Sequence, residues 1–563
     1  KELISSALHQ LEIGQREISG GGMPYGLQLM LGCMNACIHY DNPISMLDLD
    51  ENFTKLKEKI SKEGYIEGLI ESALLTNSHR LTYELKPDSS FNEKLEEYFS
   101  STLKEKEETL TDIDKNKIIK LADDLKARQE ADDDASLLPK VTIEDIPLKR
   151  EYSQSNALVG NRSIYEVGTN GLVYSDFLFP CNSLTNEELL FSSLYTFIIT
   201  EVGIQDKSYE EIQAHQSKIS GGISAAIKLQ TKESSEPGTL FLSIASKCLE
   251  ENFNAMEELI FNTIKSVRFD EEKRVLDLLN IFVARNDESL NQNGHYLAMN
   301  SAASSLNTLA TTSSHLSGLQ MIHRTKELIS KIQLDGDASY IINILQNIHS
   351  KVSSKPHKIF TACSKDALKN KLEEFEASQS KQEQQLIDAT KSQIAWITGS
   401  QVCYCAQAFA GVAREHPDSA ALSVLATVLR NGFLHTAIRE KGGAYGAGAS
   451  NDNATNTFKL FSYRDPKCKE TFQAFEDAIS WAKTSINEQH LEEAILGVVS
   501  SIDKPLSPVG EAKNDFNFNL EDINIDDRLA FRQRIINCSI EDLVRVNEKY
   551  LTKESKRSIL AGE

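Results

Sequence analysis

The feature that most constrains the fold of this chain is an internal repeat. In each copy, a strand-like segment is followed by helical patterning, then by a Gly-Gly pair that opens a second strand-like segment. These segments are 171–180, 186–220 and 221–230 in the first copy and 401–411, 418–441 and 442–452 in the second. Another strand-like segment and long helices follow in both copies. Self-similarity of this kind predicts two related structural modules.

The order of segments within each copy predicts an α+β fold. Strands gather in the first half of each module and helices in the second, which is typical of antiparallel sheets with helices packed on one face. The expected modules cover residues 138–352 and 353–563. Residues 91–137 are highly charged, with apolar residues at helical spacing, and predict a helical hairpin that links domains. A strand is expected at 79–88, where "HRLTYELKPD" ends in a Pro-Asp turn.

Length and charge exclude some classes of protein. The 563 residues are too many for one hydrophobic core. The formal net charge of −22 argues against a nucleic-acid binder, which needs a basic surface to neutralise phosphates. Solubility explains the acidic balance better than a basic ligand does. No run of about 20 apolar residues indicates a transmembrane helix, so neither nucleic acid nor a membrane is expected as a partner.

The cysteines do not form a recognisable framework. Nine cysteines, an odd number, are scattered along the chain, which suggests a reducing compartment. Cys33, Cys37 and His39 are the one tempting cluster, but zinc sites built on closely spaced cysteines use a second pair, and none is evident. We interpret these residues as buried cysteines of a helix and expect no metal site in this chain.

The second Gly-Gly pair lies in "IREKGGAYGAGASND", residues 438–452, which superficially resembles a phosphate-binding loop. A Walker loop requires a lysine where Ala449 stands. Phosphate loops also run from strand to loop to helix, so that the phosphate meets a helix N-terminus. Here a helix comes first and a strand follows, which excludes the phosphate interpretation.

Two other interpretations of this stretch stay open. Gly442 and Gly443 can form the C-cap of a helix whose last turn contains Arg439, where a positive charge complements the helix dipole. The small residues around Tyr445 can instead let another backbone approach closely, as in the wall of a peptide-binding site. The residues alone favour neither interpretation.

An ordered set of segments resembles a known family. In "TNGLVYSDFLF", "NGHYLAMNSAAS", "REKGGAYGAGA" and "FSYRDP", and in "RLTYELKPD" before the charged region, the chain is similar to the pitrilysin/insulinase-type inverzincin metallopeptidases, in particular their presequence-protease branch. The resemblance extends over essentially the whole chain.

The resemblance implies four homologous α+β domains, arranged as two halves that a helical hairpin joins and that close around a chamber. The N-terminal half of such enzymes binds zinc through a His-x-x-Glu-His motif. This chain has no such motif, because Ile13 stands where the second histidine would follow His9 and Glu12. The chain therefore resembles the C-terminal part, which agrees with its start in mid-helix. Its expected parts are the end of a second domain (1–90), the linker (91–137), a non-catalytic third domain (138–352) and a fourth domain (353–563).

By resemblance, Arg439 and Tyr445 match an arginine and a tyrosine that the C-terminal half contributes to the active site. The resemblance implies that both contact the substrate and the transition state, and that Gly442, Gly443 and Ala444 let the substrate backbone approach. In the first copy, Lys218 and Ser224 occupy the positions of the arginine and the tyrosine. The third domain is therefore expected to be a scaffold.

The resemblance implies part of a zinc oligopeptidase that degrades short unstructured peptides of the presequence type. This chain is expected to be inactive alone, because its partner, the N-terminal catalytic half, supplies the zinc. The alternative is a non-catalytic subunit of an inverzincin-type heteromer. The expected location is the cytoplasm or the mitochondrial matrix, with the bacterial periplasm still open.

Overall fold

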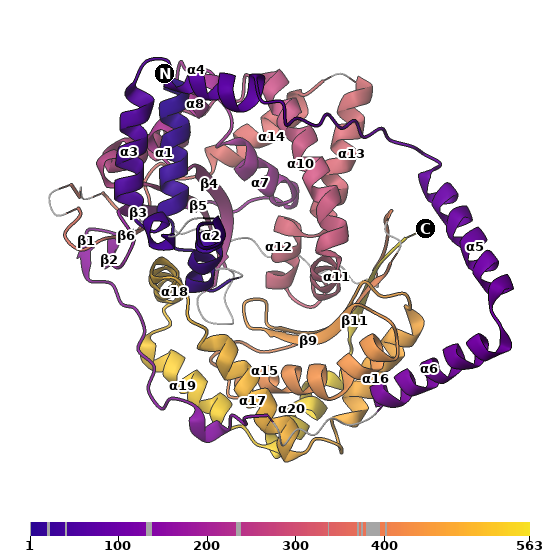
Figure 1. The fold of residues 1–563 in the computed structure, drawn as a ribbon. Coiled ribbons are helices and arrows are strands. Elements are labelled where there is room, and N and C mark those ends of the chain that lie inside the picture. The colour runs from indigo at the N-terminus through magenta and orange to yellow at the C-terminus, as the bar shows by residue number, and fades with distance from the viewer. Residues whose placement is uncertain are drawn as a thin grey trace. The chain divides into compact units, whose positions relative to one another are not determined.

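The computed structural model describes residues 2–19, 23–39, 42–130, 138–231, 238–335, 337–368, 371–372, 375–378, 394–399 and 402–562. The chain divides into two units, residues 1–49 together with 142–563, and residues 50–141. Figure 1 labels the helices and strands of both units. Each unit is described here by itself.

The smaller unit is helical. Its elements are α3 (Leu49–Ser61), α4 (Tyr65–Ile70), the π-helix η2 (Glu71–Leu75), α5 (Phe91–Thr109) and α6 (Asp112–Glu130). Two residues separate α5 from α6. The hydroxyl of Thr111 accepts a hydrogen bond from the backbone N–H of Asp114 and donates one to the Asp114 carboxylate. This reciprocal capping starts α6, so a threonine caps the helix and an aspartate supports it.

The strand expected at 79–88 is not a strand in the structure. None of its residues pairs with another strand among the described residues, and Leu81, Tyr83 and Leu85 are exposed. The alternation of apolar and polar residues is present, but an extended segment needs a neighbouring ladder to satisfy its backbone groups. The sequence prediction was therefore wrong for this segment within the chain as it stands.

The larger unit contains two sheets. The first has six strands in the order β1-β2-β6-β3-β5-β4, and the second has five in the order β7-β11-β8-β10-β9. The strands of the first sheet are β1 (Ala157–Val159), β2 (Arg162–Glu166), β3 (Leu172–Cys181), β4 (Ile223–Gln230), β5 (Thr239–Leu249) and β6 (Lys358–Cys363). Those of the second are β7 (Ile394–Ile397), β8 (Tyr404–Ala410), β9 (Gly446–Asp452), β10 (Thr457–Tyr463) and β11 (Lys556–Ala561).

Helices of the larger unit surround these sheets. They are α1 (Glu2–Arg16), α2 (Tyr25–His39), α7 (Asn186–Ile198), α8 (Tyr209–Ile219), α9 (Phe253–Ser266), α10 (Glu272–Gln292), α11 (Gly294–Ala303), α12 (Thr308–Ser317), α13 (Leu319–Asp335), α14 (Ser339–Ser350), α15 (Ser419–Leu429), the π-helix η6 (Arg430–Glu440), α16 (Lys469–Trp481), α17 (Glu488–Ile502), α18 (Pro508–Leu520), α19 (Ile525–Ile536), α20 (Ile540–Val546) and the π-helix η7 (Asn547–Leu551). Short 3-10 turns are η1 (Pro43–Met46), η4 (Ile143–Asp145) and η5 (Glu250–Asn252).

The predicted α+β class is confirmed, but the sheets are mixed rather than purely antiparallel. Most neighbours are antiparallel, whereas β2 pairs with β6 and β7 pairs with β11 in parallel. Each parallel pair joins strands far apart in sequence, which a local pattern does not reveal. Strand β6 lies beyond residue 352 and still belongs to the first sheet, so this sheet draws strands from both sides of the predicted boundary. The boundaries themselves stay a prediction.

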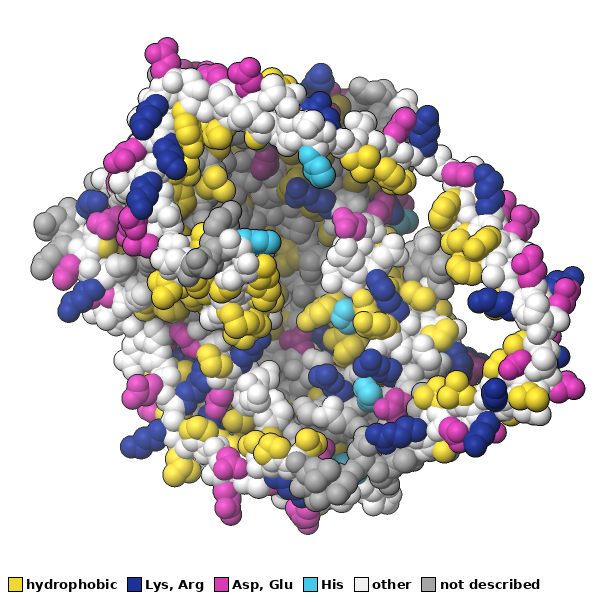
Figure 2. Space-filling model, in the orientation of Figure 1, with side chains coloured by type: hydrophobic (Ala, Val, Ile, Leu, Met, Phe, Trp, Pro, Cys, Tyr) yellow, Lys and Arg dark blue, Asp and Glu magenta, His cyan; other side chains and the backbone are white. Residues whose placement is uncertain are grey.

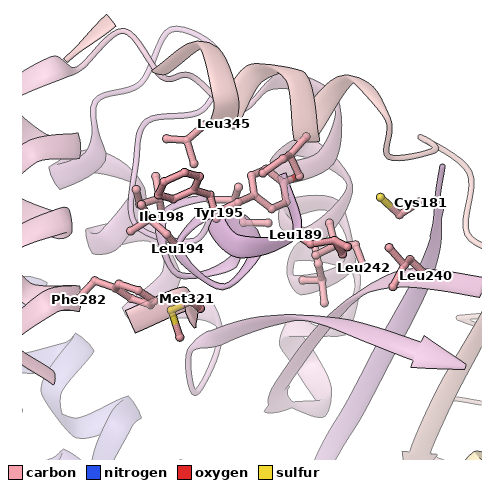
Figure 3. Packing of buried hydrophobic residues seen from close by; sticks show 14 of the residues in the cluster. Cys181, Leu189, Leu194, Tyr195, Ile198, Leu240, Leu242, Phe282, Met321 and Leu345 are labelled. Atoms are coloured by element: carbon pink, nitrogen blue, oxygen red, sulfur yellow. The ribbon is translucent and has the colours of Figure 1, made fainter. Parts of the chain in front are cut away.

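The core of the first module forms around helix α7. Apolar residues of α7 pack toward Leu240 and Leu242 of strand β5 (Figure 3). The same cluster takes in Phe282 from α10, Met321 from α13 and Leu345 from α14. Helix α7 begins at Thr185, whose hydroxyl caps the backbone N–H of Glu188 while the Glu188 carboxylate caps Thr185 in return. This reciprocal capping box fixes where the helix begins beneath the sheet.

A second difference from the expectation is that helices cover both faces of each sheet. Along β8, Tyr404, Ala406 and Ala408 belong to the core that contains α11, whereas Cys405 and Phe409 belong to the core that contains α15. This alternation is the two-residue period of a strand buried on both faces. Helix α11 of the first module thus packs on the second sheet.

Helix α18 of the second module packs on the first sheet in the same way. Ala512 and Phe516 of α18 share a buried cluster with Tyr165 and Phe360. Lys513 of α18 also pairs with the buried carboxylate of Asp176 in β3. The two modules therefore exchange one helix each, and the second face of each sheet is covered by the other module.

This exchange predicts a large effect of one methyl group at Gly294. A Cβ at Gly294, in the first turn of α11, would lie 2.5 Å from the Tyr404 ring. That ring is buried, and its hydroxyl donates to the carbonyl of Asn291 at 2.6 Å, so it cannot turn away freely. We expect Gly294→Ala to destabilise the larger unit by about 1–3 kcal/mol, as overpacking does, and to lower its melting temperature.

The matched control is Gly14→Ala in helix α1, where an added Cβ meets no atom within 4 Å. Alanine is there the better helix former by about 0.5–1 kcal/mol. Differential scanning calorimetry of both variants checks the expectation. Equal melting temperatures for Gly294→Ala and the unchanged chain would show that α11 is not tightly held against β8.

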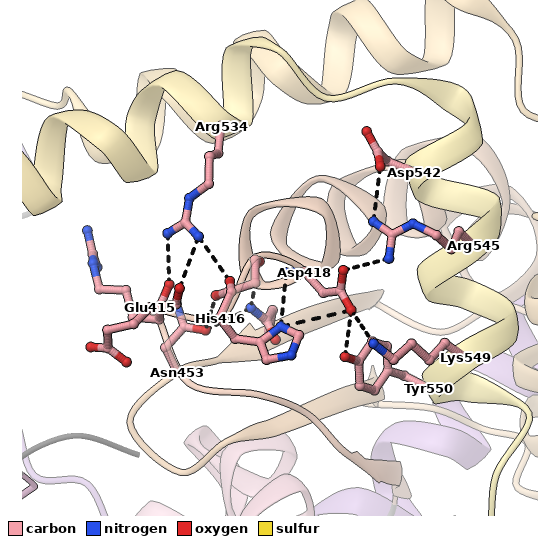
Figure 4. Close-up of polar contacts among 12 residues, drawn as sticks. Glu415, His416, Asp418, Asn453, Arg534, Asp542, Arg545, Lys549 and Tyr550 are labelled. Atoms are coloured by element: carbon pink, nitrogen blue, oxygen red, sulfur yellow. Dashed lines mark hydrogen bonds and ion pairs between the residues drawn. The ribbon is translucent and has the colours of Figure 1, made fainter. Parts of the chain in front are cut away.

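A buried aspartate anchors the start of helix α15. Asp418 is 4% exposed, and its carboxylate accepts hydrogen bonds from Arg545 (2.6 Å), Lys549 (2.7 Å) and Tyr550 (2.7 Å) (Figure 4). The first donor comes from α20 and the other two come from η7. These donors hold the pKa of Asp418 well below its usual range, although burial alone would raise it. The network fixes α15, and with it η6, relative to the C-terminal helices.

Helices α15 and η6 form one continuous segment, Ser419–Glu440. It is long and apolar enough to cross a membrane by length and composition alone. Half of its most apolar window is buried inside the fold, however, and most residues of α15 belong to the second core. On the face shown in Figure 2, acidic and basic side chains are intermixed.

Candidate functional site

The second Gly-Gly pair lies at the end of the π-helix η6. The backbone N–H of Lys441 donates to Thr436, five residues earlier, and that of Gly443 donates to Arg439 at 3.0 Å. The N–H of Ala444 then donates to Ile438 at 3.1 Å. These bonds satisfy the last carbonyls of the helix, as a glycine C-cap does.

Both glycines are needed for this turn. Gly443 has φ of 86°, in the left-handed region that favours glycine. A Cβ at Gly442 would lie 2.4 Å from the carbonyl oxygen of Ile438, so no other residue fits without moving the helix end. The capping interpretation of the pair is therefore correct, whichever further role the turn has.

The turn leads into β9, an edge strand of the second sheet, with Tyr445 just before it. The backbone N–H of Tyr445 donates to Tyr463 (3.1 Å) and to Arg464 (3.2 Å). Ala444 is buried beneath the turn, whereas the Tyr445 side chain is 66% exposed. No hydrogen bond to the Tyr445 hydroxyl is found within the described part of the chain, so the phenol is accessible to a ligand.

Glycines further along β9 have a different explanation from the predicted one. A Cβ at Gly448 would lie 2.9 Å from the ring of Phe461 on the neighbouring strand β10. The small residue is thus required by packing within the sheet. Gly446 lies opposite Tyr463 and has room for a side chain. The small residues of β9 consequently do not by themselves indicate an approaching substrate.

The structure brings Arg439 and Tyr445 together. The guanidinium carbon of Arg439 lies 5.9 Å from the centre of the Tyr445 ring, within the range of a cation–π contact. Nη1 of Arg439 lies 3.3 Å from Nε2 of His435, one turn earlier. His435 itself faces Glu440, at 3.3 Å. Across the described ranges, no carboxylate forms an ion pair with Arg439, which leaves its charge available at the surface.

Three residues around this pair were missed as site residues. The Tyr463 ring meets the Tyr445 ring edge-on at 5.7 Å, and the His295 ring from α11 meets Tyr463 at 4.8 Å. Arg464 stacks over Tyr463 at 5.5 Å and has a left-handed φ of 47°, which is uncommon outside glycine. The segment "FSYRDP" was noticed only as part of the resemblance, and nothing in the sequence links it to His295.

His295 was expected to be structural or solvent-facing, and it is structural. It joins the first module to the aromatic rings behind Tyr445. Burial lowers its pKa, so the imidazole is neutral at neutral pH. Within the described residues, its buried Nδ1 has no hydrogen-bond partner.

The corresponding turn of the first module is covered. A Cβ at Gly221 would lie 2.9 Å from the Ile13 side chain of helix α1. Gln10 of α1 donates to the carbonyls of Ser217 and Ser220 at the end of α8. Lys218, at the position of Arg439, lies 3.4 Å from Glu2. The same Gly-Gly turn is therefore a packing site for a helix in the first module and is open in the second.

The described residues do not fit a zinc site. No group of three or more histidine, cysteine, aspartate or glutamate side chains is placed to hold a metal ion in the parts of the chain that the structure describes. Glu12, in the nearest match to the zinc motif, is buried and paired with Arg16 at 2.9 Å. Cys33 and Cys37 lie on helix α2 as expected, but Cys37 is exposed, because α2 presents apolar residues at its surface.

Two family models match this chain. Residues 85–328 match a family described as associated with the peptidases of class M16, subclass C, and residues 399–560 match the PreP C-terminal domain. The second match includes Arg439 and Tyr445. The mitochondrial presequence protease of Drosophila melanogaster is 28% identical over 98% of this chain. The chain belongs to the presequence-protease type of M16 peptidase.

The match covers only part of these relatives. The chain spans 54% of the Drosophila melanogaster protein and 56% of the mitochondrial presequence protease of Mus musculus, to which it is 26% identical. Its position, with the PreP C-terminal domain at its end, is that of the C-terminal part of a presequence-protease-type M16 enzyme.

Solved structures agree on the fold. A protease from Helicobacter pylori matches 73% of this chain and 100% of its own with a TM-score of 0.53 at 14% identity. A conserved protein from Enterococcus faecalis matches 73% of this chain and 99% of its own with a TM-score of 0.51 at 12% identity. At these identities the likeness shows the fold alone.

Proposed function

We propose that this chain is the C-terminal part of a zinc metalloendopeptidase that degrades short unstructured peptides, and that Arg439 and Tyr445 are its contribution to the active site. The zinc ligands belong to an N-terminal half outside this chain. Peptides of the presequence type are the proposed substrates. The matrix of mitochondria is the proposed location, since the relatives are named as mitochondrial.

The observation that carries this proposal is the contrast between the two Gly-Gly turns. In the first module, helix α1 packs on the turn and Glu2 faces Lys218. In the second, Arg439 and Tyr445 lie at the surface of the turn beside an edge strand. An edge strand carries backbone groups that an extended peptide can pair with. The open turn therefore suits a peptide, while the covered turn suits a scaffold.

The chemistry of the two side chains supports the same role. The Arg439 guanidinium can donate to a carbonyl or carboxylate of a bound peptide, and charge-assisted hydrogen bonds of this kind contribute about 1.5–3 kcal/mol. The Tyr445 hydroxyl can donate to the carbonyl oxygen that gains negative charge when a peptide bond is attacked. Because Tyr463 and His295 pack behind Tyr445, the ring is held in place before a substrate arrives.

An apolar surface supports the proposed N-terminal partner. Helix α2 exposes a run of large apolar side chains, which are Leu27, Leu29, Met30, Leu31, Met34 and Ile38. Contiguous exposed apolar residues of this kind mark an interaction surface. The proposal assigns this surface to the N-terminal half.

Peptide cleavage tests the proposal. We expect the chain alone to leave a quenched fluorogenic peptide intact, with or without added zinc. The same chain joined to an N-terminal half that carries His-x-x-Glu-His is expected to cleave it, and a chelator is expected to abolish that cleavage. Zinc-dependent turnover by the chain alone would contradict the proposal. Failure of the joined protein to cleave any unstructured peptide would favour a non-catalytic subunit.

A further inference from the structure

Two cysteines of the second module lie unusually close together. Sγ of Cys468 is 2.6 Å from Sγ of Cys403, about half an ångström longer than the roughly 2.05 Å bond of a disulfide. Cys403 immediately precedes strand β8, and Cys468 immediately precedes helix α16. The two residues are 65 positions apart in the sequence, so the fold brings them together.

Backbone hydrogen bonds hold the two thiols in this position. The N–H of Cys403 donates to Asp465 at 2.8 Å, and the N–H of Asp465 donates back to Cys403 at 2.9 Å. The buried Asp465 carboxylate accepts from Thr471 (2.6 Å) and from the N–H of Lys467 (2.9 Å). The turn that ends at Cys468 is thus fixed against Cys403, and a bond between the two sulfurs requires little movement of the backbone.

We propose that Cys403 and Cys468 form an oxidisable dithiol site, which a low-molecular-weight disulfide such as oxidised glutathione converts to an intramolecular disulfide. One thiol loses its proton, and its thiolate attacks the small disulfide, which releases one glutathione and leaves a mixed disulfide. The other thiol then loses its proton and displaces the second glutathione. The protein gives up two electrons and two protons, and two molecules of reduced glutathione form.

Burial protects the site at neutral pH without closing it. Burial raises the pKa of Cys403 to about 12, so little of it is thiolate at pH 7. Cys403 and Cys468 nevertheless both remain partly exposed, whereas Cys405, two residues along the same strand, is fully buried. Sγ of Cys405 approaches only the backbone oxygen of Cys468, at 4.0 Å. Cys405 is therefore the natural control.

Oxidation at this site constrains the surface around Tyr445. The turn between β10 and Cys468 carries Tyr463, which packs against Tyr445, and Arg464. A disulfide would tie this turn to β8 by a covalent bond in addition to its hydrogen bonds. The thiol chemistry does not depend on the proposed peptidase function. Only the consequence for substrate contacts at Tyr445 rests on it.

Thiol counting on the full 563-residue chain tests the proposal. The chain is incubated at pH 8 with oxidised glutathione, quenched with N-ethylmaleimide under denaturing conditions, and weighed by intact mass spectrometry. We expect nine labels on the reduced chain, one for each cysteine, and seven after oxidation with no glutathione attached. Cleavage after glutamate is expected to give a cross-linked pair of peptides, one ending at Glu415 and the other at Glu470.

Variants assign the bond. Cys403→Ser and Cys468→Ser are expected to abolish the cross-link, and Cys405→Ser is expected to retain it with one label fewer in total. The oxidised chain is also expected to melt at a higher temperature than the reduced chain, because the bond closes a long loop in the unfolded state. Nine labels after oxidation, or a cross-link that depends on Cys405 instead of Cys403, would overturn the proposal.

Discussion

Replacing Tyr445 with phenylalanine in the full-length peptidase is expected to lower kcat by about 10²–10³, the usual loss when one donor to a developing oxyanion is removed. KM is expected to change little, because the hydroxyl acts when charge develops and the ring still packs on Tyr463. Steady-state cleavage of a fluorogenic peptide by the purified full-length variants measures both constants.

Arg439→Ala should act differently from Tyr445→Phe. If the guanidinium binds the peptide in the ground state, its loss raises KM, and Arg439→Lys recovers only part of the effect because an ammonium lacks the planar fork. The matched control is Lys218→Ala, at the same position of the covered turn in the first module. Its kinetics should equal those of the unchanged enzyme. Equal losses from Lys218→Ala and Arg439→Ala would mean that the two turns do not differ in function.

Asp418→Asn is expected to cause the largest loss of stability in the second module. The carboxylate accepts three hydrogen bonds, two of them from charged groups, in a nearly dry position (Figure 4). The asparagine keeps the shape but removes the charge. Because Arg545 and Lys549 are about half exposed and regain water, we expect a loss of about 2–3 kcal/mol. Calorimetry should show a lower melting temperature for the larger unit.

The pH dependence of this effect follows from the depressed pKa of Asp418. A carboxyl group whose folded-state pKa lies below its unfolded value stabilises the fold above the unfolded value, about 3.9, and loses that contribution as the pH falls further. The difference in melting temperature between the unchanged chain and Asp418→Asn should therefore be constant from pH 8 to 5 and shrink below about pH 4.

The control for both measurements is Glu541→Gln, an exposed position on the same helix as Arg545, where a change of no more than about 0.5 kcal/mol is expected. A difference that already shrinks between pH 7 and 5 would point to His416 instead. Its Nδ1 lies 3.9 Å from the Asp418 carboxylate.

Local signals in the sequence located many of the elements correctly. The strand at 171–180 and the helix at 208–220 correspond to β3 and α8, and the helix at 418–441 corresponds to α15 with η6. Such elements carry their own evidence, for example the Ser208 and Glu211 side chains that cap the start of α8. Repetition of the same order then identified two related modules.

Long-range features escaped the sequence because their partners are remote. Nothing near Lys358 indicates that β6 pairs with β2 about 200 residues earlier. The strand expected at 79–88 had the right alternation and no partner. In the site, the resemblance identified Arg439 and Tyr445, and the glycine turn followed from capping rules. The ring of His295 behind Tyr463 could not be foreseen, since it depends on how α11 crosses between modules.

That crossing has a consequence for how the chain folds. Each module lends a helix to the other, so a cut between the modules would leave two apolar sheet faces, at Tyr404 and at Tyr165, without cover. The repeat looks divisible in sequence, but its halves are obligate partners. The larger unit should therefore unfold in a single cooperative step. A gene duplication of this kind can diverge residue by residue, yet neither copy can be lost or transferred on its own.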